Sequence, residues 1–243
     1  MAKPNSKSDD AYAKVLGQIE ACRARGGVHL NLNGFRLSML PPEIGQLTAL
    51  TSLHVDYNQL STLPPEIGQL TALKRLDLMN NQLSTLPPEI GQLAALTTLR
   101  LNNNQLRTLP PEIGRLVRLE RLILENNMLK ILPESLNDLR SLKQLTLHGN
   151  VGLSLHTELL GPKLAESTDL NPSADPRAIL DFYFSRQAEG EEPMREVRLL
   201  LVGRGRVGKT SLLYVLRAAP TEKDEPARPR KKAVTRREEK VSA

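Results

Sequence analysis

Aromatic residues are scarce in this sequence: they make up 3% of the 243 residues, and tryptophan is absent. The core must therefore be built from aliphatic side chains, and leucine recurs at regular intervals. The one cysteine, Cys22, excludes an internal disulfide and fits a reducing compartment. The N-terminus lacks the apolar segment of a signal peptide, and no apolar run is long enough to span a bilayer. These absences predict a cytoplasmic protein with no membrane span.

Charge of one sign is also lacking over most of the chain. The formal net charge is +6, yet residues 28–158 carry 11 basic and 11 acidic side chains, so the excess lies near the two ends. A nucleic-acid-binding domain needs a basic stripe on its folded face. We therefore expect no nucleic-acid partner.

The sequence contains a repeat of 23 residues. The string Leu-Pro-Pro-Glu-Ile-Gly occurs at 40–45, 63–68, 86–91 and 109–114, and an earlier, degenerate unit carries Phe35 at the position where later units have asparagine. The first leucine and the asparagine of the regular units are Leu50 and Asn58, Leu73 and Asn81, Leu96 and Asn104, Leu119 and Asn127, and Leu142 and Asn150. A fixed period of this length predicts a solenoid of stacked units over residues 28–160.

Each part of the unit has a physical interpretation. The L-x-L step has the period of a strand with one buried face, which directs Leu53 and Val55 inward. A buried asparagine after the strand can satisfy turn amides, and the stacked asparagines can form a ladder. The Pro-Pro pair stops the strand, and Ile67 and Leu70 close the core from the convex side, where only a 3₁₀ or single helical turn fits. The fold class is therefore α/β, with six strands forming a parallel sheet on the concave face.

The two ends of the solenoid need caps. Residues 1–27 form a tail and a cap helix over 9–25, with Asp9 or Asp10 as N-cap and Gly26-Gly27 as its end. Its apolar face consists of Val15, Leu16, Ile19 and Cys22. The last unit breaks register at Val151-Gly152, so we expect the repeats to end near 158–161.

The strand positions between the buried leucines form the candidate partner-binding surface. They vary between units while the scaffold positions do not, and their mixed polar character suits a protein or peptide; a merely solvated face is the alternative. These candidates are His54, Asp56, Tyr57, Arg75, Asp77, Met79, Thr98, Arg100, Asn102, Arg121, Ile123, Glu125, Gln144, Thr146 and His148.

Metal and catalytic sites are not indicated by the sequence. The four histidines are scattered, and none has metal-ligand spacing with cysteine or carboxylates, so we interpret them as surface residues. They are His29, His54, His148 and His156. No Ser-His-Asp or Cys-His arrangement is present, and we assign no catalytic residue and no enzyme activity to this chain.

Residues 161–195 read as a linker and an aromatic helix. The linker is rich in Pro, Ser and Asp, and Asp175-Pro176 makes an N-cap and first-turn pair. The helix spans roughly 176–188, and we expect its apolar patch to dock one domain on another. That patch consists of Ile179, Leu180, Phe182 and Tyr183.

A phosphate-binding motif follows. Residues 197–202 read as a buried strand, 203–210 fit G-x-x-x-x-G-K-T, and 211–216 read as an apolar helix. Such a loop turns backbone N–H groups toward phosphates; Lys209 would reach the outer phosphates and Thr210 would ligate Mg²⁺. The candidate nucleotide-binding residues are Gly203, Arg204, Gly205, Arg206, Val207, Gly208, Lys209, Thr210 and Ser211. Residues 218–243 read as a disordered basic tail, so residues 196–217 form only the start of a nucleotide-binding domain.

The units of 28–160 resemble the leucine-rich repeats of bacterial proteins, and residues 10–217 together resemble the start of a Roco protein. In that family leucine-rich repeats precede a Ras-like GTPase domain (Roc) and a dimerising region (COR). Gly203, Gly208, Lys209 and Thr210 match the family's phosphate loop, whereas Arg206 departs from it. The family's D-x-x-G and N-K-x-D motifs are missing, so the chain looks truncated just after the loop.

Two functions follow as predictions. The first is a scaffold that binds a protein or peptide partner through the concave face of the repeats. The alternative, implied by the resemblance, is a regulatory switch that binds GTP or GDP with Mg²⁺ through residues 203–211.

Overall fold

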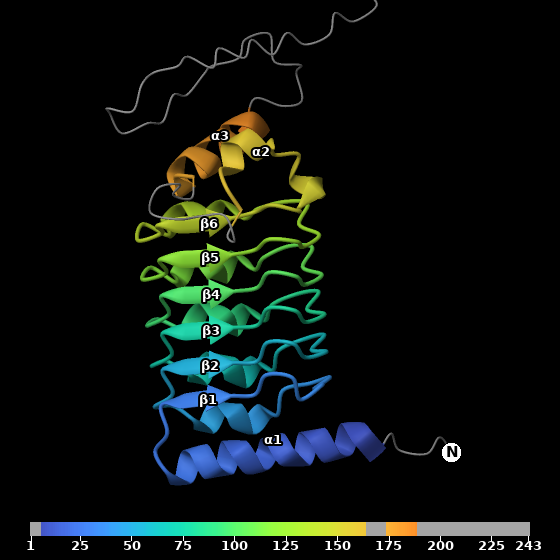
Figure 1. Cartoon of the computed structure of the whole chain (residues 1–243). Helices are drawn as coiled ribbons and strands as arrows, with labels where there is room; N and C mark the ends of the chain where they lie inside the picture. Colours follow the sequence, from blue (N-terminus) through green and yellow to red (C-terminus); the bar gives the residue numbers. More distant parts are fainter. Residues whose placement is uncertain (1–5, 164–173, 189–243) are drawn as a thin grey trace, which may run out of the picture. The chain divides into compact units, whose positions relative to one another are not determined.

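The computed structural model describes residues 6–163 and 174–188. The leucine spacing produces six short parallel strands, which pair in chain order and in a register of 23 residues, so that Leu53 lies opposite Leu76 (Figure 1). The strands are β1 (His29–Asn31), β2 (Ser52–His54), β3 (Arg75–Asp77), β4 (Thr98–Arg100), β5 (Arg121–Ile123) and β6 (Gln144–Thr146). The predicted six-stranded parallel sheet is confirmed.

The core lies on one side of this sheet. Alternate side chains of a strand point to opposite faces, and the leucines at the predicted inward positions, such as Leu76 and Leu78, are fully buried. The opposite wall of the core comes from the Pro-Pro-Glu-Ile-Gly segments, whose Ile67 and Ile90 are also fully buried. Each unit therefore buries its apolar side chains against the units before and after it.

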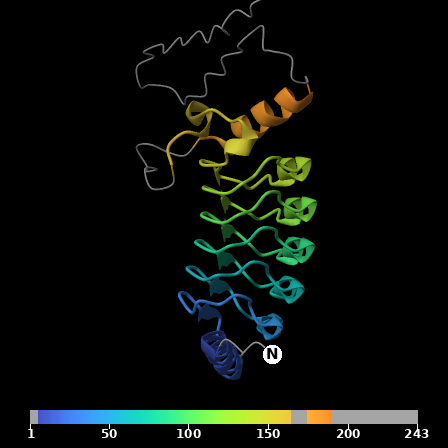
Figure 2. The ribbon, with the colours of Figure 1, turned by 90° about the vertical axis from the view of Figure 1, so that its right-hand side faces the viewer.

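Short 3₁₀ helices form that opposite wall, as the 23-residue period predicted. The first proline of each pair is extended, as at Pro64 with φ −70° and ψ 146°, and the helix begins at the second proline in the first four copies. Figure 2 shows the sheet on one side of the stack and these helices on the other. They are η1 (Pro42–Gln46), η2 (Pro65–Gln69), η3 (Pro88–Gln92), η4 (Pro111–Arg115) and η5 (Glu134–Asp138). A further 3₁₀ turn, η6 (Val151–Leu153), follows β6.

The predicted asparagine ladder is present. Asn81 Oδ1 accepts a hydrogen bond from the N–H of Leu60 (3.1 Å), and Asn81 Nδ2 donates to the carbonyls of Val55 (2.9 Å) and Leu78 (3.1 Å). The same pattern recurs at Asn58, Asn104, Asn127 and Asn150. Each asparagine thus satisfies buried backbone groups of its own unit and of the preceding one, which fixes the spacing of the stack.

Helix α1 (Ser6–Ala24) covers the first unit. It begins at Ser6, so the prediction that Asp9 or Asp10 is the N-cap was wrong; both lie inside the helix. Val15, Ile19 and Cys22 are buried as predicted, and Leu16 is half-buried. The predicted glycine end is confirmed: Gly26 has φ +59° and Gly27 N–H donates to Cys22 O (2.8 Å), which closes the last turn.

Helices α2 (Thr157–Leu160) and α3 (Pro176–Ala188) follow the last unit. The predicted bounds of α3 and its Asp175 cap are confirmed, because Asp175 Oδ1 accepts the N–H of Arg177 (3.0 Å). The helix buries Ile179, Leu180 and Tyr183 against the repeat core. Phe182, which was predicted with them, is only half-buried.

Helix α3 docks on η5 and replaces the unit that would come next. The Tyr183 hydroxyl accepts the N–H of Leu132 (3.0 Å), and Arg177 Nη1 donates to Asn137 O (2.8 Å). Among the described residues this aromatic helix is therefore a cap of the solenoid. None of the described helices is long and apolar enough to cross a membrane.

Candidate functional site: the exposed face of the sheet

The face of the sheet turned away from the core, which we call the sheet face, carries three side chains from each unit. They belong to the first and third residues of each strand and to the residue two positions after the strand ends. In the sequence they alternate with the buried residues of the core. Fourteen of the fifteen predicted residues occupy these positions. The exception is Tyr57, which lies in the turn after β2 with φ +57°. Ser52, which pairs with Arg75, takes its place, and the 23-residue register could have identified it.

Asp77 on β3 lies at the centre of a charge network. Its Oδ2 accepts hydrogen bonds from His54 Nδ1 (2.9 Å) and Arg75 Nε (2.9 Å), and Arg100 Nη1 lies 4.0 Å away. The side chain of Asp77 is only 2% exposed, whereas those of Arg75 and Arg100 are 41% and 27% exposed. The carboxylate is thus buried beneath the guanidinium groups that it holds in place.

Asp56 on the neighbouring unit is buried next to this network. Its Oδ1 accepts the N–H of Met79 (2.9 Å), so the carboxylate takes part in joining the two units. Burial raises the pKa of Asp56 above its ordinary value; the hydrogen bond from Met79 opposes this, and repulsion by Asp77 adds to it. Keeping Asp56 charged in the folded chain therefore costs free energy of folding.

His54, Asp56 and Asp77 bring potential metal-ligating atoms within 4.8 Å of one another, a cluster that the sequence analysis missed. The two carboxylates, however, are matched by two guanidinium groups, since Arg75 and Arg100 both approach Asp77. A divalent cation would have to displace Arg75 and would meet no net negative charge. The geometry therefore favours an ion-pair network that orients arginines over a metal centre.

His148 does not lie on the surface, contrary to the prediction. It is buried, and its Nε2 lies 2.9 Å from the carbonyl of Gly161, beyond the last strand. Its Nδ1 lies 3.7 Å from Glu125 Oε1. The segment after β6 thus covers this end of the sheet face, whereas side chains nearer its middle, such as Arg75 and Arg121, stay accessible.

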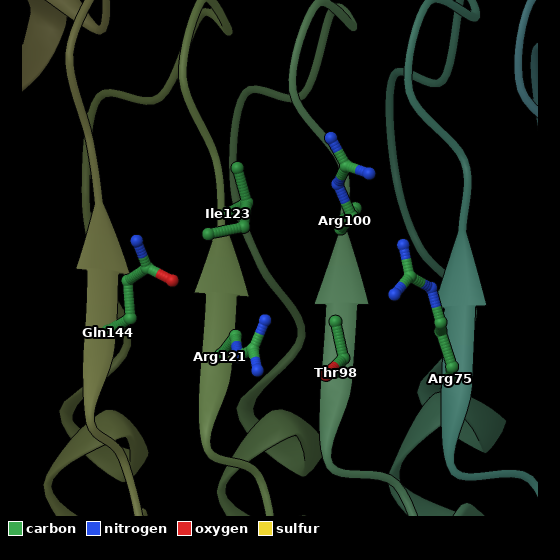
Figure 3. A pocket seen from close by; sticks show the side chains of 6 residues that line it. All are labelled: Arg75, Thr98, Arg100, Arg121, Ile123 and Gln144. Carbon is green, nitrogen blue, oxygen red and sulfur yellow. The ribbon is translucent and has the colours of Figure 1, made fainter. Parts of the chain in front are cut away.

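A hollow of about 180 Å³ lies on the sheet face over β3 to β6. Four neighbouring strands contribute to it, so it exists only when the units are stacked. Figure 3 shows the guanidinium groups of Arg75 and Arg121 leaning toward β4 from its two sides, with Thr98 between them. The lining residues are Arg75, Thr98, Arg100, Arg121, Ile123 and Gln144.

Other predicted sites lie outside the described residues. These are the strand 197–202, the nucleotide-binding candidates 203–211, the helix 211–216 and the tail 218–243.

One parallel strand per unit, an asparagine ladder and a 3₁₀ helix on the opposite side define a leucine-rich-repeat solenoid. Comparison with family profiles agrees with this class. The profile described as "Leucine-rich repeat region" matches residues 66–161, and "Leucine Rich Repeat" matches 49–70. The repeating units are therefore leucine-rich repeats. A comparison with curated proteins gave no match.

Solved structures with leucine-rich repeats are similar to parts of this chain. A leucine-rich-repeat protein of Leptospira interrogans is 36% identical over 54% of this chain and 40% of its own, with a TM-score of 0.45. The ectodomain of an Arabidopsis thaliana receptor kinase, GASSHO1/SCHENGEN3, is 34% identical over 54% of this chain and 16% of its own (TM-score 0.46). YopM of Yersinia enterocolitica is 32% identical over 56% and 28% (TM-score 0.46). The chain thus spans less than half the length of each of these proteins.

Proposed function

We propose that this chain is an interaction scaffold that binds a protein or peptide on its sheet face. Leucine-rich-repeat proteins commonly use the extended surface of the stacked strands for binding. The observation that carries the proposal is the hollow over β3–β6, because four different units supply side chains to it while their scaffold residues stay nearly constant. Three arginines and Ile123 line it, and exposed arginine beside apolar surface is typical of protein interfaces.

A peptide-display selection on the purified full chain tests this proposal. Thr98→Trp fills the hollow with a large ring, whereas Thr71→Trp places the same ring at an exposed position after η2. We expect selected peptides to lose at least about tenfold in affinity for Thr98→Trp and to bind Thr71→Trp like the unchanged chain. Peptides that bind both variants equally, or a selection that enriches none, would contradict the proposal.

We propose nucleotide binding by residues 203–211 as a second function. It is supported by the G-x-x-x-x-G-K-T spacing, in which Lys209 would bind the outer phosphates and Thr210 the Mg²⁺ ion, and by the order of segments shared with Roco proteins. Titration with fluorescent GDP and GTP in Mg²⁺ tests it, with Lys209→Ala as the control. Saturable binding that disappears in the control supports this function, and absence of saturation into the high micromolar range contradicts it.

A further inference from the structure

The charge that the sheet face presents to solvent differs from the charge that its composition suggests. The face carries acidic and basic residues in similar numbers, but Asp56 and Asp77 are buried whereas Arg75 and Arg100 remain partly exposed. Arg121 on β5 is exposed, and it forms no ion pair with any other residue that the structure describes. A partner that approaches the middle of this face therefore meets guanidinium groups first.

The arrangement of these arginines suits a carboxylate. Arg75 and Arg121 lean toward β4 from its two sides (Figure 3), and Thr98 offers a hydroxyl donor between them. A guanidinium presents paired N–H donors that match the two oxygens of a carboxylate. Asp77 already binds Arg75 through its Oδ2, so Arg75 is fixed in direction. Within the described part of the chain, the Arg121 guanidinium has no carboxylate partner that would compete for its donors.

The width of the basic cluster limits the class of partner. The first strand positions carry arginine only on β3 and β5, and the corresponding residues on β1, β2 and β6 are His29, Ser52 and Gln144. At about 4.8 Å between strands the cluster is roughly 10 Å wide. A nucleic-acid backbone needs a longer basic track, whereas one or two acidic side chains of a peptide fit this width.

We infer that the sheet face recognises an acidic peptide segment, with a carboxylate seated over Thr98 between Arg75 and Arg121. This inference deepens the proposed scaffold function and rests on it. Ile123 forms an apolar wall of the same hollow and would contact the aliphatic part of the acidic side chain. Asp77 orients Arg75, and the buried Asp56 and Asp77 reduce the positive potential of the face, which favours a carboxylate over a polyphosphate.

The test uses fluorescein-labelled hexaglutamate, hexaglutamine and a six-nucleotide oligothymidylate, each titrated against the full chain by fluorescence anisotropy at low ionic strength. Arg121→Gln is the test variant. Arg115→Gln is its matched control, because Arg115 is an exposed arginine of the preceding unit at the end of η4, across the core from the sheet. Both variants remove one positive charge, so nonspecific attraction to the chain falls equally.

We expect hexaglutamate to bind about tenfold more weakly to Arg121→Gln and with unchanged affinity to Arg115→Gln, and hexaglutamine to show no saturable binding. Equal loss in both variants would overturn the inference, as would tighter, Arg121-dependent binding of the oligothymidylate. If display-selected peptides depend on Thr98 but are not acidic, the scaffold function stands and this inference fails.

Discussion

The two faces of the repeat stack differ in how their residues vary from unit to unit. On the side of the 3₁₀ helices, Pro-Glu-Ile-Gly is identical in η1 to η4. On the sheet face, the first strand position changes at every step from one unit to the next. Residues on the helical side pack against the repeated segment one unit away, as Gly68 does against Glu89, so a change at one level affects two interfaces. Residues on the sheet face border solvent, so they are free to differ, and binding specificity can be built there.

The largest effect that this comparison predicts comes from the glycine of the helical side. A Cβ on Gly91 would lie 2.5 Å from the carbonyl oxygen of Glu112 in the next unit, and the backbone cannot yield without separating the two units. We expect Gly91→Ala to lower the free energy of unfolding by about 3 kcal/mol, measured by urea denaturation followed by circular dichroism.

The chain contains its own control for that substitution. Asn137 occupies the glycine position of the unit that begins at Leu119, where α3 rather than another 3₁₀ helix packs, and its side chain is exposed. Asn137→Ala should therefore change stability by less than about 0.5 kcal/mol. Equal effects of the two substitutions would show that close approach between units does not explain the glycine.

A second, smaller effect separates two asparagines of one unit that are equally buried, each 7% exposed. Asn104 accepts the N–H of Leu83 and donates to the carbonyls of Leu78 and Leu101, whereas Asn102 Oδ1 on the sheet face has no hydrogen-bond partner in the described part of the chain. We expect Asn104→Ala to cost about 2–3 kcal/mol, because it leaves buried backbone groups unpaired.

Asn102→Ala should cost less than about 1 kcal/mol, since it removes no such bond. The same denaturation measurement compares the two variants. A cost for Asn102→Ala as large as that for Asn104→Ala would mean that the sheet face carries as much of the stability as the ladder does.

A third prediction concerns the turn after β2. Tyr57 has φ +57°, a conformation that favours glycine or asparagine, and Asn80, Asn103 and Asn126 occupy the same position in later units. Tyr57 is 60% exposed, so it buries little apolar surface in return. Tyr57→Asn should raise the free energy of unfolding by about 1 kcal/mol, seen as a higher denaturation midpoint.

A loss of stability in Tyr57→Asn would show instead that the tyrosine ring makes a contribution larger than the backbone strain. Asn80→Tyr is the reciprocal variant, and we expect it to destabilise the chain by a similar amount.

The scaffold could be predicted from the sequence because its determinants are local and periodic. Leu53, Asn81 and Ile67 recur at fixed offsets, so their burial follows from the period alone. The site was less predictable. Alternation places Arg75 and Asp77 on the same face, but it does not reveal that one is exposed and the other buried under its neighbours.

Burial on the sheet face depends on residues of adjacent units and on residues after the last strand. His148 illustrates the second case, because the carbonyl that it contacts belongs to Gly161, after the last strand. The start of α1 at Ser6 was missed for a simpler reason: an aspartate is a common N-cap, but Asp9 and Asp10 are equally compatible with the first turns of a helix that begins earlier.

The smallest predicted effect tests whether a buried charge on the sheet face lowers the free energy of unfolding. Burial raises the pKa of Asp56 in the folded chain, so folding favours the protonated carboxyl. The resulting contribution to stability is present below the pKa of the unfolded chain, about 3.9, and is lost as the pH rises through the higher pKa of the folded state. Asp56→Asn removes the charge and keeps an oxygen for the Met79 N–H.

We therefore expect Asp56→Asn to be slightly more stable than the unchanged chain near pH 7, and this difference to disappear on acidification below the unfolded pKa. Urea denaturation at the two pH values measures it. Lower stability of the variant near pH 7 would mean that attraction by Arg100 and His54 outweighs the cost of burial. Higher stability would mean that the sheet face contains a carboxylate that destabilises the fold. This is expected of a residue whose role is to support the arrangement of charges on the face and not to stabilise the fold.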